Sequence, residues 1–127
     1  MTKNETGIGD FLLEIKDVVS KPISADISSW VFVPRQDNLD CLTELGLTFE
    51  DVREIILELS IDDYCSGPVD DHNENGVVWI FGKMVLGVEL YVKLKLAQIG
   101  NLKMVRVISL HKAKMPLSHP ITIQESK

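Results

Sequence analysis

The chain has few of the residues that mark secreted, membrane or redox proteins. Its 127 residues include two cysteines, Cys41 and Cys65, which form no Cys-x-x-Cys pair and suit a reducing compartment. Charged residues interrupt every apolar stretch before it reaches the length of a membrane span. The first residues also lack a basic segment followed by an apolar run, so we expect no signal peptide and a cytoplasmic protein.

Metal-ligand spacing is absent as well. His72, His111 and His119 lie far apart in the sequence, and none has a cysteine at ligand spacing. Residues 71–76 begin like a calcium-binding EF-hand loop, but the position that should supply a bidentate glutamate is Gly82. We therefore interpret residues 71–76 as a polar turn, and we expect neither a metal nor another cofactor.

The charges that are present divide the chain into two parts. The net charge of −6 disfavours general nucleic-acid binding. However, residues 37–75 hold twelve acids and one base, whereas residues 79–115 hold seven bases and one acid. The basic part can present a local anion site, or its bases can simply be solvated on strand faces.

Helices are predicted before residue 64. Apolar residues at helical spacing predict a helix over residues 8–20, and residues 36–45 form a shorter one that ends at Gly46. Between them, residues 30–33 are a short strand or an extended segment, because they are apolar, favour β-structure and precede a proline.

Two capping patterns predict where the later helical segments begin. Thr48 with Asp51 has the form of a capping box for a third helix. Ser60 with Asp63 repeats the pattern for one further helical turn. Residues 69–76 then form a polar loop.

After this loop the apolar period changes to that of strands. We predict strands at about residues 77–84, 88–97 and 103–111. The chain is thus one α+β domain over residues 1–127, with N-terminal helices on an antiparallel sheet of three strands or slightly more. Residues 115–127 carry two prolines and are predicted to be a loose tail.

One strand face carries the residues best suited to chemistry. Alternation places Tyr91, Lys93 and Lys95 on the face opposite the leucines of their strand. The neighbouring strands add three further candidates, namely Lys83, Arg106 and His111. Arg106 and His111 differ in parity, so only a bulge or a strand end brings both to this face. The same pattern also fits a solvated sheet face whose lysines protect an edge.

The order and spacing of several segments resemble the motility quorum-sensing regulator (MqsR) family of toxin ribonucleases, over about residues 11–116. The helical part of the resemblance and its sheet part rest on these segments: residues 45–50, 55–60, 63–64, 79–83, 91–96 and 108–111. Tyr91 and Lys93 match the family's Tyr-x-Lys strand, and His111 falls where the family ends its last strand with a basic residue. Cys65 and Ser66 stand where the best-known form has a lysine.

This resemblance implies a RelE-like fold and a metal-independent endoribonuclease. Such a toxin belongs to a toxin–antitoxin system and is also called an mRNA interferase. It is a hydrolase that cleaves mRNA, either free or on the ribosome. A cognate antitoxin protein binds and inhibits it. We accordingly expect Tyr91, His111 and Lys83 to be catalytic, and Lys93, Lys95 and Arg106 to bind RNA.

The chemistry of RNA cleavage without a metal suits these residue types. The 2′-hydroxyl is the nucleophile, a general base takes its proton, cations stabilise the phosphorane, and an acid protonates the leaving oxygen. The alternative is a non-catalytic protein-binding module, either an inactive toxin relative or an immunity-type partner. Its acidic helical part, residues 37–75, would then bind a basic protein.

Overall fold

The computed structural model of the protein describes residues 3–21 and 29–121, and side chains are described from Gly7 onward in these ranges. In chain order the elements are α1 (Lys3–Ser20), β1 (Trp30–Phe32), α2 (Gln36–Leu45), α3 (Phe49–Glu58), the 3₁₀ turn η1 (Ile61–Asp63), β2 (Tyr64–Asp70), β3 (Val77–Val85), β4 (Val88–Ile99) and β5 (Leu102–Lys112). Helices precede most of the sheet, so the predicted α+β class is confirmed.

α2 has the predicted bounds and α3 begins after Thr48 as predicted, whereas α1 ends at Ser20 as predicted but already begins at Lys3 rather than at residue 8. Gly46 follows α2 with a left-handed φ of 67°, a conformation that costs glycine little. The capping box of α3 is complete, because the Thr48 hydroxyl accepts from the Asp51 N–H and the Asp51 carboxylate accepts from the Thr48 N–H. None of the helices in the described part of the chain has both the length and the apolar character needed to cross a membrane.

The strands form one mixed sheet in the order β1-β5-β4-β3-β2. β1 runs parallel to β5, and the other neighbours are antiparallel. The three predicted strands correspond to β3, β4 and β5, and the short apolar segment is β1. The sheet thus has five strands rather than three, and one of them, β2, was not predicted from the sequence.

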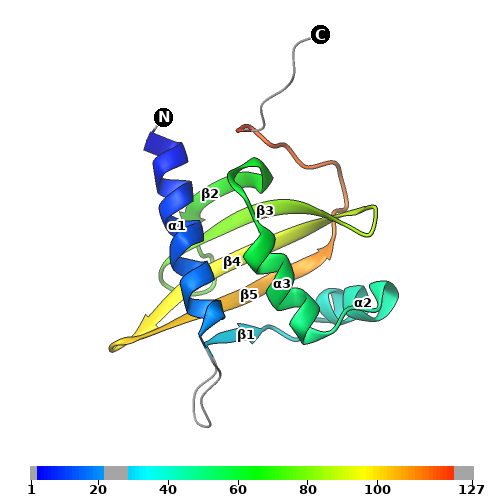
Figure 1. The fold of residues 1–127 in the computed structure, drawn as a ribbon, viewed down its shortest axis with the longest axis horizontal. Helices are drawn as coiled ribbons and strands as arrows, with labels where there is room; N and C mark the ends of the chain where they lie inside the picture. The colour runs from blue at the N-terminus through cyan, green and yellow to red at the C-terminus, as the bar shows by residue number, and fades with distance from the viewer. Residues whose placement is uncertain (1–2, 22–28, 122–127) are drawn as a thin grey trace.

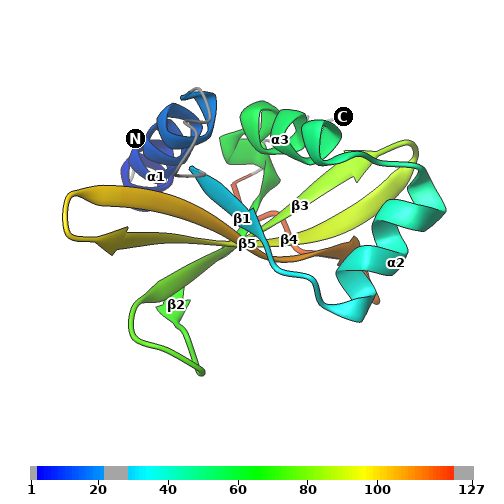
Figure 2. The ribbon, with the colours of Figure 1, turned by 90° about the horizontal axis from the view of Figure 1, so that it is seen from below.

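β2 lies at the edge of the sheet, where pairing is irregular. The sequence predicted the end of a helical turn and a polar loop here, whereas Tyr64–Asp70 pairs with β3 through two register shifts. Pro68 is tolerated because an edge strand does not need every N–H for the ladder. Figure 2 shows that β2 bends away from α1 and α3, so the loop after it lies on the other side of the sheet.

The core lies between the sheet and the helices α1 and α3, which cover one of its faces (Figure 1). Phe11 of α1 stacks on Trp79 of β3 with ring centroids 4.6 Å apart. The predicted core residues are all buried in one cluster, which confirms the register of β4: Ile55, Ile56, Leu59, Leu90, Val92 and Leu94.

Candidate functional site

The face of the sheet away from α1 and α3 carries the candidate site. Tyr91, Lys93 and Lys95 of β4 all project from it, because Leu90, Val92 and Leu94 are buried on the helix-covered face. Their cross-strand partners on β5 are His111, Ser109 and Arg106, respectively.

A bulge in β5 is what brings Arg106 and His111 to the same face. Leu94 pairs with Val107 and Lys93 pairs with Ser109, so Ile108 is the extra residue. An extra residue reverses the parity of every position that follows it in the strand. His111 is thereby placed beside Tyr91 while Arg106 remains beside Lys95.

Asn38 of α2 holds this bulge in place. Its fully buried amide donates to the carbonyl oxygens of Val33 and Ile108, at 2.9 and 3.0 Å. Its side-chain oxygen accepts from the Leu110 N–H at 3.0 Å. Asn38 therefore fixes α2 against the bulged part of β5, and so acts as a positioning residue for His111. Sequence reasoning missed it, because a lone asparagine in a short helix carries no distinctive pattern.

Tyr91 and His111 form a stacked pair at the end of this face. Their ring centroids lie 5.3 Å apart with an interplanar angle of 16°. The His111 Nδ1 lies 3.0 Å from the Lys112 carbonyl oxygen, a contact that favours a proton on Nδ1. Burial, with a smaller effect from Cys65, raises the pKa of Tyr91, so its phenol keeps its proton at neutral pH. The pair thus offers an imidazole Nε2 and a phenolic O–H.

The other end of the face is covered by acids from the β2–β3 loop. The Lys95 ammonium donates to the Asp71 carboxylate and to the Asn75 carbonyl oxygen, both at 2.7 Å. Arg106 donates to the two carboxylate oxygens of Glu74 at 3.0 and 3.1 Å. The hydrogen bond from Lys95, with one from the loop backbone, lowers the pKa of Asp71 to about 2.

These contacts divide the face into two halves. We call Lys95 and Arg106, with Asp71 and Glu74 over them, the covered half. Lys95 lies on the predicted face of β4, but it is 5% exposed and its ammonium is bonded to Asp71, so it is not open to an RNA phosphate as it stands. Arg106 is partly exposed but already has a carboxylate partner. We call Tyr91, Lys93 and His111 the open half.

Lys83 does not lie on this face. It pairs with Leu90 across the β3–β4 hairpin, and paired residues point to the same side of a sheet. Its ammonium lies 3.9 Å from the Asp63 carboxylate, near η1. The expected position of Lys83 at the rim of the Tyr91 face is therefore wrong. The turn Leu86–Gly87 was the available signal, because a two-residue hairpin loop fixes the pairing of its strands.

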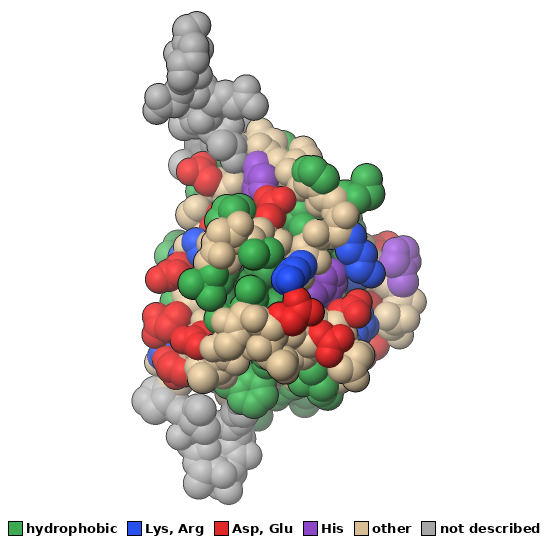
Figure 3. All heavy atoms as spheres, turned by 90° about the vertical axis from the view of Figure 1, so that its right-hand side faces the viewer, with side chains coloured by type: hydrophobic (Ala, Val, Ile, Leu, Met, Phe, Trp, Pro, Cys, Tyr) green, Lys and Arg blue, Asp and Glu red, His purple; other side chains and the backbone are tan. Residues whose placement is uncertain are grey.

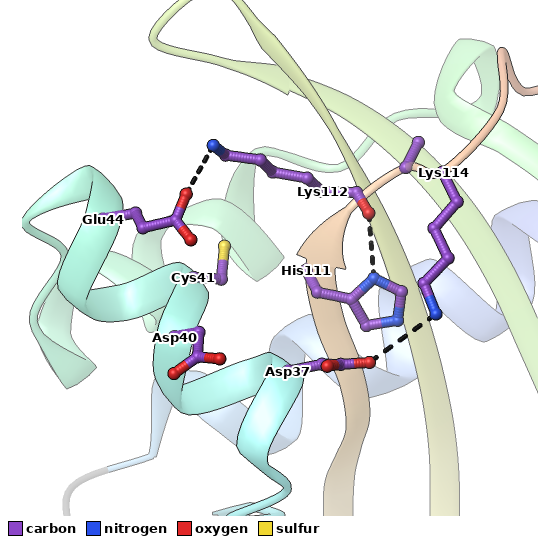
Figure 4. A pocket seen from close by; sticks show the side chains of 8 residues that line it. Asp37, Asp40, Cys41, Glu44, His111, Lys112 and Lys114 are labelled. Atoms are coloured by element: carbon purple, nitrogen blue, oxygen red, sulfur yellow. Dashed lines mark hydrogen bonds and ion pairs between the residues drawn. The ribbon is translucent and has the colours of Figure 1, made fainter.

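Two pockets meet at His111. The first, which we call the α2 pocket, is an open hollow of about 260 Å³ between α2 and the end of β5. Figure 4 shows the His111 ring facing Asp37 of α2, with Lys114 beside both. It is lined by Asp37, Asp40, Cys41, Glu44 and residues 111–114.

The second pocket shares His111 and Lys114 with the first and has a volume of about 470 Å³. Its lining combines the Tyr91–His111 pair with one ammonium and three apolar side chains, from Lys114, Met115, Pro116 and Leu117. We call residues 113–121 the strap and this cavity the strap pocket. The apolar residues that line it were assigned to a loose tail on sequence grounds.

The strap is held at several points. The Ala113 N–H donates to the Glu89 carbonyl oxygen at 2.9 Å, and the Leu117 N–H donates to the Glu89 carboxylate at 3.1 Å. His119 lies between that carboxylate and the Asp62 carbonyl oxygen, at 2.8 and 3.1 Å. The prediction of a loose tail is thus wrong for residues 115–121, and residues 122–127 lie outside the described part.

The cations near His111 differ in whether a carboxylate already pairs with them. Lys112 is hydrogen-bonded to Glu44, which raises the pKa of Lys112. Lys114 is mostly exposed and lies 3.8 Å from Asp37. The Lys93 side chain has no ion pair or hydrogen bond with any residue that the structure describes. Figure 3 shows basic, acidic and histidine side chains close together on this side of the molecule. Lys93 and Lys114 are therefore the cations best placed to meet an anion.

Neither cysteine has the properties of a nucleophile. Burial, with Glu44 adding to it, raises the pKa of Cys41. Burial, with Glu89 and Asp63, raises the pKa of Cys65 to about 11. Both thiols keep their protons at neutral pH, and a thiol is a poor nucleophile compared with its thiolate. Proton transfer at the open half therefore falls to His111 and Tyr91.

Comparisons of the chain with known protein families, with curated proteins and with solved structures found no match. Within the described residues, no three histidine, cysteine or carboxylate side chains are grouped so that they can hold a metal ion.

Proposed function

We propose that the chain is a metal-independent endoribonuclease of the toxin type, which cleaves mRNA and is inhibited by a cognate antitoxin. The observation that carries the proposal is the grouping of Tyr91, Lys93 and His111 on one accessible face, beside two pockets. The resemblance of the segments around Tyr91 and His111 to MqsR-family toxins supports it and implies a RelE-like fold. The two free cysteines favour a cytoplasmic location.

The open half can supply the groups that the reaction needs. The 2′-hydroxyl of RNA attacks the adjacent phosphorus, a 2′,3′-cyclic phosphate forms, and the bond to the 5′-oxygen breaks. The His111 Nε2 takes the proton of the 2′-hydroxyl, and the Tyr91 phenol gives a proton to the leaving oxygen. Lys93 and Lys114 stabilise the charge on the phosphorane. Lys83 and the covered half have no part in this scheme.

The test is cleavage of a long mRNA by the purified chain, with and without ribosomes. We expect His111→Ala and Tyr91→Phe each to lower the cleavage rate ~10²–10⁴-fold, the usual contribution of a general acid or base. His72→Ala is the matched control, because His72 is exposed on the β2–β3 loop, away from the open half. This variant should cleave RNA at the wild-type rate. Cleavage should persist in EDTA. A wild-type protein that does not cut the mRNA at high protein concentration, either with or without ribosomes, contradicts the proposal.

The partner follows from the same proposal. A cognate antitoxin that blocks a basic, partly open face gains association rate from complementary charge. Affinity purification of the chain from its native cell, followed by mass spectrometry, should recover a small partner protein whose binding weakens at high salt. Recovery of the chain alone would count against an antitoxin.

One observation favours a second function, that of a non-catalytic protein-binding module. Asp71 and Glu74 neutralise two of the four cations of this sheet face and the strap, whereas many acids of α2 and α3 remain exposed. Such an acidic surface fits a basic partner protein. The second function is correct if the wild type fails to cleave RNA and instead binds a basic protein. That binding should be lost in the double variant Asp40→Asn with Glu54→Gln.

A further inference from the structure

The strap pocket has a lining suited to a planar, partly apolar ligand. Two nearly parallel rings form one part of its wall, and three apolar side chains of the strap form another. Its volume of about 470 Å³ lies within the usual range for small-molecule sites. Proteins that recognise single-stranded RNA hold unpaired bases against aromatic and histidine side chains in this manner.

The apolar wall depends on a close approach of the strap to β3. Gly82 is the cross-strand neighbour of Tyr91, and it leaves room for the strap. A Cβ added at Gly82 would lie 2.7 Å from Leu117 Cδ1 and 2.9 Å from His119 Cε1. With the bonds to Glu89, this approach fixes Leu117 beside the Tyr91 ring rather than in solvent.

Cations mark where a charged group attached to such a ligand would lie. Lys114 lines both pockets, and Lys93 is two residues from Tyr91 on the same face of β4. Residues so spaced on a strand are roughly 7 Å apart, which is comparable to the distance between a base and its phosphate. A base in the strap pocket therefore leaves its phosphate within reach of Lys93 or Lys114.

We propose that the strap pocket binds one unstacked base of single-stranded RNA, next to the phosphate that is cleaved. The inference rests on the proposed function, because RNA supplies the base. Met115 and Leu117 are then specificity-determining residues, since they shape the wall that the base contacts. The base and the phosphate are held by different parts of the chain, the strap and β4.

Binding of nucleotides to the full chain tests the pocket without requiring cleavage. We would measure affinities for the four nucleoside monophosphates, for ribose 5-phosphate, and for a short 2′-O-methyl RNA that cannot be cleaved. At least one nucleotide should bind roughly 5- to 100-fold more tightly than ribose phosphate, as expected from base stacking. The RNA should bind more tightly than the free nucleotide. Equal affinities for nucleotides and ribose phosphate would overturn the inference, and a free nucleotide that binds more tightly than the RNA would identify a nucleotide site instead.

Substitutions in the strap separate the pocket from the rest of the site. Met115→Ala and Leu117→Ala should abolish the preference for a nucleotide over ribose phosphate. Met115 is 75% exposed, so its variant is expected to fold. Met84→Ala is the matched control, because Met84 is also exposed and does not line the pocket. Gly82→Ala should weaken nucleotide binding too, by displacing Leu117. Unchanged preferences in Met115→Ala and Leu117→Ala would refute the assignment.

The failure of this inference can be told from failure of the proposed function. If the chain binds nucleotides through the strap but does not cut RNA, the assignment of the pocket stands and the proposed cleavage activity is wrong. If the chain cuts RNA through His111, and Met115→Ala and Leu117→Ala cut at the same sites and rates, the cleavage activity stands and the assignment of the pocket is wrong.

Discussion

The covered half and the open half of the sheet face carry similar residue types but have different surroundings. Each half has a lysine of β4 paired across the sheet with a residue of β5. Lys95 is buried under the β2–β3 loop and bonded to Asp71, whereas Lys93 has no side-chain partner in the part of the chain that the structure describes. Alternation along a strand therefore identifies a face, whereas the loops that fold over that face decide which of its cations remain available.

The largest expected effect is a loss of stability from a substitution in the hydrophobic core beneath both halves. Leu94 is fully buried between them on the opposite side of β4, so Leu94→Ala should lower the free energy of unfolding by ~2–5 kcal/mol. Urea denaturation measures this change. Leu13→Ala is the control, because Leu13 is 72% exposed on α1 and its loss should change stability little. Equal effects of the two substitutions would contradict the register of β4.

A somewhat smaller loss of stability is expected from a substitution that disturbs the open half alone. Asn38→Ala leaves the Val33 and Ile108 carbonyl groups and the Leu110 N–H without their partner, which costs about 1–3 kcal/mol. NMR chemical shifts should move at residues 108–112 and stay unchanged at residues 71–76. Asn101→Ala, in an exposed turn, should alter neither segment. Shifts of equal size in both segments would mean that Asn38 supports the whole sheet rather than the bulge.

The two lysines should respond oppositely to the same substitution. Lys93→Ala should weaken RNA binding, reduce the slope of log affinity against log salt by about 0.7, and leave stability unchanged, as expected for one lost phosphate contact. Lys95→Ala should destabilise the fold, because it leaves Asp71 without its partner, and should leave the salt slope unchanged. Salt titrations of RNA binding and urea denaturation give both quantities. If Lys95→Ala lowers the salt slope as Lys93→Ala does, the covered half also meets RNA.

The smallest expected effect is confined to acid and to the covered half. The pKa of Asp71 falls from 3.8 to about 2 on folding, so its ionised form stabilises the fold at pH values above 3.8. That stabilisation is lost as the pH falls through about 2. The difference in free energy of unfolding between wild type and Asp71→Asn should therefore be constant near neutral pH and shrink in this range. A difference that does not change with pH would show that charge does not hold the loop.

Local patterns predicted much of the fold. The alternation of Leu90, Val92 and Leu94 gave the buried face of β4, and the pair Thr48–Asp51 marked the start of α3. These features depend on neighbouring residues alone. β2 was missed for a related reason, because an edge strand with Pro68 and two register shifts has no alternation to detect.

The candidate site was harder to predict because it depends on contacts between distant residues. Tyr91 and Lys93 were found from strand parity, whereas parity left the position of His111 open. Its grouping with them requires the bulge at Ile108 and the buried amide of Asn38. The acidic and basic parts of the chain were visible in the sequence. Nothing local indicated that Asp71 would fold back onto Lys95 and remove it from solvent.

The tie between Asn38 and Leu110 also has a consequence for how the protein folds, because it joins positions 72 residues apart. Contacts between such distant residues form slowly, since a long stretch of chain must be closed before they stabilise anything. During synthesis α2 and β1 emerge well before β5, so neither finds its partner until nearly the whole described chain has left the ribosome. A chain interrupted before β5 holds the acidic helices but lacks His111, and therefore lacks both of the pockets that this residue lines.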